Sequence, residues 1–203
     1  MNNLQKIFEF TKISGKLKST ERWSNTSTMI NKESSADHSW HLALLVPIVA
    51  RELKLDVNIE RSMMLALVHD LVEAIAGDTD HSLIAWGIKT TEDKNKEEIA
   101  AMVQIRDSLS RETGTMIHDI WNEYETGETP EARYVKALDK IETINHMLVI
   151  GHESFDHPEL IAPYPKKAVL NFPEILPLYQ ELLDRLKPEF AKKGWEWSDE
   201  YNI

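Results

Sequence analysis

The sequence predicts an all-α protein, and two observations carry this prediction. Apolar residues recur at helical spacing in several separate stretches, as at Ile141, Ile144 and Leu148. No stretch alternates apolar and polar residues in the way that marks a half-buried strand, and there is no internal repeat or low-complexity linker. The length of 203 residues predicts a single domain, 1–203, with enough chain to bury a core.

Caps and breaks divide the first part of the chain into helices. The predicted helices cover about residues 3–18, 35–53 and 59–76. The first is interrupted near Ser14 and is followed by a loop over 20–31. Ser34 or the next serine is suited to cap the second helix, and Gly77 is suited to end the third in a left-handed conformation.

The second part of the chain begins with long helices and ends in a proline-rich region. The predicted helices cover about residues 90–109, 116–124, 130–149 and 174 or 178 to 187. Pro130 suits the first turn of its helix. Five prolines between residues 151 and 177 predict an irregular segment broken by short helical turns.

Composition excludes several classes of function. The net charge of −11 argues against binding a nucleic-acid polymer, although a local pocket can still be positive enough for a small phosphate ester. The absence of cysteine excludes disulfides and thiolate metal ligands. The N-terminal residues have no apolar signal core, and the apolar runs are shorter than the ~20 residues that span a bilayer. We therefore expect a cytoplasmic protein without a membrane partner.

The predicted helix over 59–76 contains ionisable residues in an apolar stretch, and this combination indicates a functional site. Residues 63–78 are almost continuously apolar, yet His69, Asp70 and Glu73 lie among them. An unpaired charged group in an apolar surround costs several kcal/mol, so such groups are usually paired or bind a metal. Spacings of three and four residues would bring these side chains to one side of a continuous helix.

Potential metal ligands also occur in two other predicted helices. His38 lies in the first turns of the helix over 35–53, and Asp139 is embedded in the helix over 130–149. Together with His69 and Asp70 they form a set of imidazoles and carboxylates that suits one divalent ion, namely Mn, Co, Ni, Zn, Fe or Mg. Four protein ligands leave octahedral positions for water and substrate, as catalytic sites require.

The order of these ligands resembles the H…HD…D signature of the HD-domain phosphohydrolase superfamily. Neighbouring residues narrow the resemblance to the bacterial HD-domain 5′-deoxynucleotidases. The segments that carry it lie at 22–23, 33–40, 69–73, 77–78 and 137–140. The resemblance covers roughly residues 20–150, so it implies a metal-site core there and a helical, proline-rich extension over about 151–203.

The resemblance also implies a role for each matching residue. The implied metal ligands are His38, His69, Asp70 and Asp139; the implied catalytic residues are Glu73 and Asp78; the implied substrate contacts are Arg22 and Trp23. Arginine suits a phosphate because its planar guanidinium can bind two oxygens at once. The sequence does not assign a role to His146, His152 or His157, although His146 lies two helical turns after Asp139 and could reach the same pocket.

The expected function is a metal-dependent 5′-nucleotidase that releases phosphate from (deoxy)ribonucleoside 5′-monophosphates. Two alternatives stay open at this point. One is a phosphodiesterase or pyrophosphohydrolase acting on a nucleotide or another small phosphate ester. The other is a nucleotide-sensing HD protein without turnover. The expected partner is a small nucleotide or phosphate ester, and apolar positions on the outer helices allow a homodimer.

Overall fold

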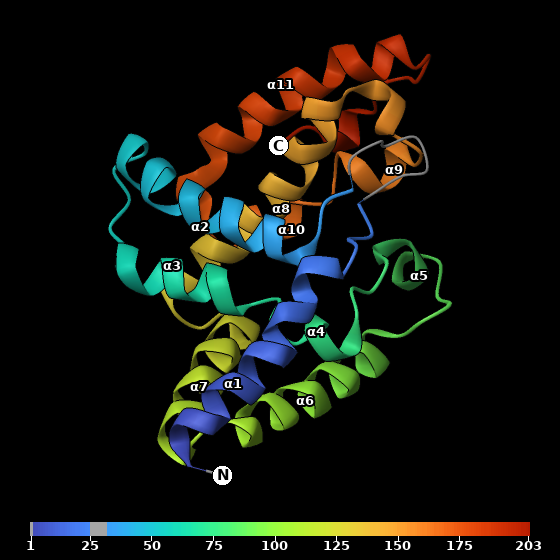
Figure 1. Ribbon diagram of the computed structural model, residues 1–203. Helices are drawn as coiled ribbons and strands as arrows, with labels where there is room; N and C mark the ends of the chain where they lie inside the picture. The colour runs from blue at the N-terminus through green and yellow to red at the C-terminus, as the bar shows by residue number, and fades with distance from the viewer. Residues whose placement is uncertain (1, 25–31) are drawn as a thin grey trace.

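The computed structural model describes residues 2–24 and 32–203, and over these ranges the protein is built from α-helices and short 3₁₀ helices (Figure 1). Within the described residues there is no strand, and β pairing is limited to one isolated bridge between Glu21 and Ser34. The predicted all-α class is confirmed. Most of the predicted loop over 20–31 lies outside the described residues.

The N-terminal helices follow the predicted pattern. Helix α1 (Asn3–Ser14) ends where the interruption was predicted, and the 3₁₀ helix η1 (Gly15–Ser19) continues the chain. Helix α2 (Ser35–Glu52) is capped by Ser34, whose hydroxyl accepts a hydrogen bond from the Asp37 backbone N–H. The capping box starts α2 three residues before His38 and so places that histidine in the first turn.

The single helix predicted over 59–76 is wrong, because the chain turns sharply in its middle. Helix α3 (Ile59–Val68) and the short helix α4 (Glu73–Ala76) are separated by four residues in turns. Across this break the backbone N–H groups bond three residues back instead of four, as from Glu73 to the Asp70 carbonyl at 3.0 Å. Gly77 ends α4 at a positive φ of 76°, but its ψ of 160° is not that of a left-handed helix.

The middle of the chain contains four further helices. They are α5 (His81–Ala85), α6 (Thr91–Ser108), α7 (Arg111–Thr126) and α8 (Pro130–Ile150). Helix α7 begins before the predicted residue 116, because Ser110 caps it by accepting a hydrogen bond from the Thr113 backbone N–H.

The C-terminal region forms the predicted series of short turns and then one long helix. Its elements are η2 (His152–Ser154), α9 (Pro158–Ile161), α10 (Lys166–Leu170), η3 (Pro173–Ile175), α11 (Leu176–Lys192) and η4 (Asp199–Tyr201). Helix α11 passes through Pro188 and extends beyond the predicted end at residue 187. The fully buried Phe190 ring explains this, since it packs against Phe155 and Trp195 and holds the last turn in place.

Helix α8 lies at the centre of the molecule and contacts α2, α3, α7 and α11 (Figure 1). It buries residues on all sides, including the fully covered Tyr134, whose hydroxyl donates to the Val46 carbonyl of α2. A polar group on such a helix must find a partner inside the protein. No helix in the described part of the chain is long and apolar enough to cross a membrane.

Candidate metal centre

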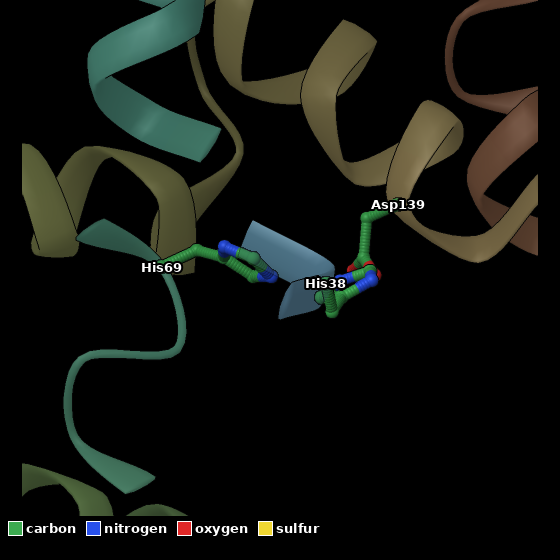
Figure 2. A group of neighbouring side chains, drawn as sticks. All are labelled: His38, His69 and Asp139. Carbon is green, nitrogen blue, oxygen red and sulfur yellow. The ribbon is translucent and has the colours of Figure 1, made fainter. Parts of the chain in front are cut away.

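Three side chains from three separate elements point toward one another (Figure 2). His38 comes from α2, His69 follows the end of α3, and Asp139 comes from α8. One potential ligand atom from each lies within 4.8 Å of the other two, and the three residues are exposed by 0%, 3% and 2%. Such a compact, buried group of nitrogen and oxygen donors is the arrangement that a divalent metal needs.

The two imidazoles are held so that their inner nitrogens carry a lone pair. His38 Nδ1 donates to Glu142 Oε2 at 2.5 Å, and His69 Nδ1 donates to the Ala66 carbonyl at 2.8 Å. Since these acceptors have no proton to give, the proton of each neutral ring resides on Nδ1 and leaves Nε2 as the donor atom for a metal. Both Nε2 atoms are buried and make no hydrogen bond to a described residue. These residues therefore fit a metal ion.

The two carboxylates predicted as ligands lie beside these nitrogens. Asp70 Oδ2 is 3.1 Å from His69 Nε2 and 3.9 Å from His38 Nε2. Asp139 Oδ1 is 3.2 Å from His38 Nε2, while its Oδ2 accepts from the Tyr124 hydroxyl at 2.6 Å. The structure thus brings the four predicted ligands together.

The electrostatics of this group favour a cation. Burial by itself would lower the pKa of His38, but the neighbouring carboxylates of Asp139 and Glu142 raise that pKa to about 10. A proton and a metal ion compete for the same nitrogen lone pair. The carboxylates that favour the proton would favour a divalent ion in the same place.

Glu73 and Asp78 lie next to each other, and the pKa of each is raised. Glu73 Oε2 accepts from the Ser35 hydroxyl at 2.5 Å, and Asp78 Oδ2 accepts from the Trp23 backbone N–H at 2.5 Å. Burial raises the pKa of Glu73 well above its ordinary value, and the charges of Asp70 and Asp78 raise it further. Burial also raises the pKa of Asp78, which forms a hydrogen bond with Glu73. Two carboxyl groups can bond in this way only when one is protonated.

Arg22 is buried beside the four predicted metal ligands and is fixed from several sides. Its terminal nitrogens donate to Asp70 Oδ2 and to Thr143 Oγ1, both at 3.0 Å, and its Nε is 3.2 Å from Glu33 Oε2. Each terminal nitrogen carries a second hydrogen, and no other described residue accepts it. A rigid guanidinium with two such hydrogens can bind an anion without first losing side-chain entropy.

A cavity of about 800 Å³ opens beside this group. Arg22, Asp70, Glu73 and Asp139 line one part of it. Other lining residues include three rings in mutual contact, which form an aromatic wall: Trp23, His81 and Tyr164, with ring centroids 4.8 to 5.7 Å apart. The cavity combines a charged site with an aromatic wall, a combination typical of small-molecule sites.

Two site residues were missed by sequence reasoning for different reasons. Glu142, which holds His38 and also accepts from His41 Nδ1 at 2.6 Å, follows Asp139 by one helical turn, and that spacing was a usable signal. Tyr164 lies in the proline-rich region, and nothing in the sequence relates it to Trp23.

The chain is similar to known proteins along most of its length. The model of a family described as HD domain matches residues 14–160. A relative from Danio rerio named 5'-deoxynucleotidase HDDC2 is 31% identical over 202 residues, which cover 97% of this chain and 96% of the relative. A Dictyostelium discoideum protein of the same name is 36% identical over 150 residues, which cover 70% of this chain and 75% of that protein.

A solved structure supports the fold. The crystal structure of a "Predicted metal-dependent phosphohydrolase" from Magnetospirillum magnetotacticum MS-1 superposes with a TM-score of 0.78 and covers 96% of both chains at 24% identity. The resemblance to 5′-deoxynucleotidases expected from the motifs is confirmed by the curated relatives. Because the family model spans well over half of the sequence and these relatives align along most of it, the chain belongs to the HD domain family.

Proposed function

We propose that this protein is a metal-dependent 5′-nucleotidase that releases phosphate from (deoxy)ribonucleoside 5′-monophosphates. The observation that carries the proposal is the pair of buried Nε2 atoms of His38 and His69, which face Asp139 beside Arg22 and an open cavity. The names of the curated relatives support the same activity.

His38, His69, Asp70 and Asp139 would hold the metal. The set contains nitrogen and carboxylate oxygen donors only, which suits Mn, Co, Ni, Zn, Fe or Mg. When bound, such an ion supplies Lewis-acid chemistry, because it polarises a phosphoryl oxygen and makes water more acidic. Asp139 is oriented for this role by Tyr124, which donates to the oxygen that does not face His38.

Arg22 would bind and orient the phosphate. Its contacts with Asp70 and Thr143 hold the guanidinium beside the ligand group, and its free hydrogens match the geometry of two phosphate oxygens. Trp23 is the first member of the aromatic wall and would lie against the sugar, as the resemblance implies. Through these contacts, binding of the nucleotide would also align the bond that breaks.

The Glu73 and Asp78 pair would move the protons. Hydrolysis forms a bond from water oxygen to phosphorus and breaks the bond between phosphorus and the sugar O5′. The water must lose a proton, and O5′ must gain one. A carboxyl pair that shares one proton can accept the first and return the second without any net change in its charge.

Phosphate release from a panel of nucleotides tests this function. Purified protein loaded with Mn or Co is expected to release inorganic phosphate from deoxyribonucleoside 5′-monophosphates. Cleavage of a diester or pyrophosphate bond would leave the phosphate on one product and would identify another hydrolase activity. If protein shown to contain metal releases no phosphate from any monophosphate, the proposal is wrong.

We also propose a cytoplasmic location and a homodimer. The lack of cysteine and the nucleotide chemistry support the first. Trp40, Leu44 and Ile48 support the second, since they recur every four residues on α2 and are exposed by 64%, 46% and 48%. Light scattering coupled to size-exclusion chromatography would measure the mass, and a monomer at micromolar concentration would contradict the dimer.

A further inference from the structure

The cavity extends beyond the metal ligands into a basic region. Three lining residues define this region, and we call them the distal basic cluster: Arg133, Lys136 and Lys167. The first two lie on α8, three residues apart, so both can face the cavity from one side of the helix. Lys167 lies on α10 and lines the cavity from the C-terminal region. The cluster is positive although the whole chain carries a net charge of −11.

Lys136 is a partly buried ammonium group without a carboxylate partner among the described residues. Its Nζ lies 4.3 Å from the centroid of the Tyr124 ring, and no described acidic oxygen forms a salt bridge with it. Burial lowers the pKa of Lys136, although the charge of Glu125 acts in the opposite direction. An ammonium group that is partly removed from water and is not paired with a carboxylate can bind an anion favourably.

The other members of the cluster are also free to bind an anion. Arg133 donates through one terminal nitrogen to the Glu128 carbonyl at 2.7 Å, and no other hydrogen bond joins its guanidinium to a described residue. Lys167 forms no salt bridge with any described residue. The one acidic residue lining this part of the cavity, within the described ranges, is the exposed Glu125.

The remaining cations of the cavity already have partners. Arg22 is paired with Asp70, and Lys140 Nζ is 2.9 Å from Asp139 Oδ2. Lys94 is paired with Glu98 at 2.5 Å. The phosphate that reacts would be held by the metal ligands and Arg22, so the distal basic cluster is not needed for a monophosphate.

We propose that the distal basic cluster binds a second phosphate group, one carried on the sugar of the nucleotide, so that the preferred substrates are nucleoside 2′,5′- or 3′,5′-bisphosphates. This inference rests on the proposed function, since it assumes that the 5′-phosphate occupies the metal site. Asp139 and Arg133 are six residues apart on α8, which is ~9 Å along the helix axis. The two phosphates of a 5′-diphosphate share a bridging oxygen, so both would stay near the metal. In a 2′,5′- or 3′,5′-bisphosphate the sugar separates the two phosphates, so the second can reach the distal basic cluster.

Catalytic efficiency with matched nucleotides tests the proposal. The metal-loaded protein is assayed with deoxyadenosine 5′-monophosphate, deoxyadenosine 3′,5′-bisphosphate, adenosine 2′,5′-bisphosphate and deoxyadenosine 5′-diphosphate. We expect kcat/KM for a bisphosphate to exceed that for the monophosphate at least tenfold, with the difference mainly in KM. The bisphosphate with the larger increase in kcat/KM shows whether the second phosphate is bound at the 2′ or the 3′ position of the sugar.

Variants connect that preference to the cluster. In Lys136→Gln and Arg133→Gln, the ratio of bisphosphate to monophosphate efficiency should fall roughly tenfold to a hundredfold, as expected when one charge-assisted hydrogen bond is lost. Lys96→Gln is the matched control, because it removes the same charge from an exposed pair on α6 outside the cavity, and its ratio should stay that of the unmodified protein. Circular dichroism checks that each variant is folded.

Calorimetric titration measures binding of the same nucleotides separately from turnover. Tighter binding of a bisphosphate that Lys136→Gln abolishes supports the proposal. Equal binding of mono- and bisphosphate, equal losses for both in the variants, or a preference for the 5′-diphosphate would overturn it. In each of these cases, hydrolysis of monophosphates would still support the proposed function. If no nucleotide is hydrolysed at all, the proposed function is wrong, but the result of the binding experiment still stands.

Discussion

At the scale of single residues, the hydrogen bond that His38 makes through Nδ1 affects how well its Nε2 can bind a metal. Glu142 accepts hydrogen bonds from His38 and from His41, and these bonds lower its pKa to about 2 against the opposing effect of burial. The carboxylate therefore stays ionised, fixes the ring and makes Nε2 more basic. Glu142 is a positioning residue, because it acts through His38.

Replacing Glu142 by glutamine should weaken metal binding. In Glu142→Gln the amide is neutral, so we expect affinity for Mn or Co to fall about 10- to 100-fold. Competition with a chelator of known affinity measures this change. His41→Gln is the control, since His41 contacts the same carboxylate from a half-exposed position and should have a much smaller effect. Unchanged affinity in Glu142→Gln would show that Glu142 does not position His38 for metal binding.

Removal of a ligand and removal of the proton carrier should have separable effects. We expect His69→Ala or Asp70→Ala to abolish metal binding, because the nitrogen or oxygen donor is lost. Glu73→Gln should keep its metal and lower kcat by about 10² to 10⁴, the usual contribution of a general acid or base. Metal analysis and steady-state kinetics on the same samples make the comparison. Normal metal content in Asp70→Ala would contradict its assignment as a ligand.

At the scale of elements, α6 and α7 pack closely because α7 has a glycine, Gly114, where it meets the end of α6. A Cβ built on Gly114 would lie 2.3 Å from the Arg106 carbonyl oxygen, a backbone atom that cannot move aside easily. Gly114 is buried inside α7, where a glycine is otherwise unfavourable. The close contact between the two helices is the reason for its presence.

Alanine at Gly114 should therefore destabilise the protein, although alanine favours a helix. We expect Gly114→Ala to reduce the free energy of unfolding by about 1–3 kcal/mol, as overpacking does. Gly15→Ala is the matched control: Gly15 has ordinary helical dihedrals and no atom near its Cβ position, so its variant should be neutral or more stable by ~0.4–1 kcal/mol. Urea denaturation measures both. Equal stability of the two variants would mean that α6 moves away at no cost.

At the scale of the whole molecule, one buried apolar cluster connects the metal-site core with the C-terminal extension. The cluster runs from Leu17 of η1 to Phe190 of α11, and α11 packs on the central helix α8. We therefore propose that residues 1–203 form a single domain that unfolds in one step. The site itself draws on segments as distant as Arg22 and Lys167, so metal and fold should be coupled.

Metal binding should raise the thermal stability of the whole chain. An ion that binds the folded state alone adds ~2.7 kcal/mol at a hundredfold excess over Kd, which corresponds to a rise in Tm of roughly 5–10 °C for a domain of this size. Scanning calorimetry should show one transition that moves up with Mn or Co and down again with a chelator. His69→Ala should show no rise, and an equal rise in that variant would place the bound ion elsewhere. Two separate transitions would contradict the single domain.

The candidate metal ligands could be selected from the sequence because they are chemically exceptional where they occur. His69, Asp70 and Asp139 stand out as ionisable groups in mostly apolar stretches of the sequence, and the all-α class follows from periodicity over long segments. The turn between α3 and α4 was not predictable in this way, because an apolar run favours a helix and contains no proline or glycine to break it. Helix α11 was predicted too short for the opposite reason, since packing of Phe190 outweighs the effect of Pro188.

The sequence by itself determined the helical class, the potential metal ligands and their order along the chain, because helical periodicity and misplaced charges are local properties. Only the tertiary structure decided which groups meet. It placed Glu142 behind His38, joined Tyr164 to Trp23, and gathered Lys167 with Lys136 around one cavity. These pairings depend on how helices pack, and packing is set by the shape of the whole buried core, which no single segment contains.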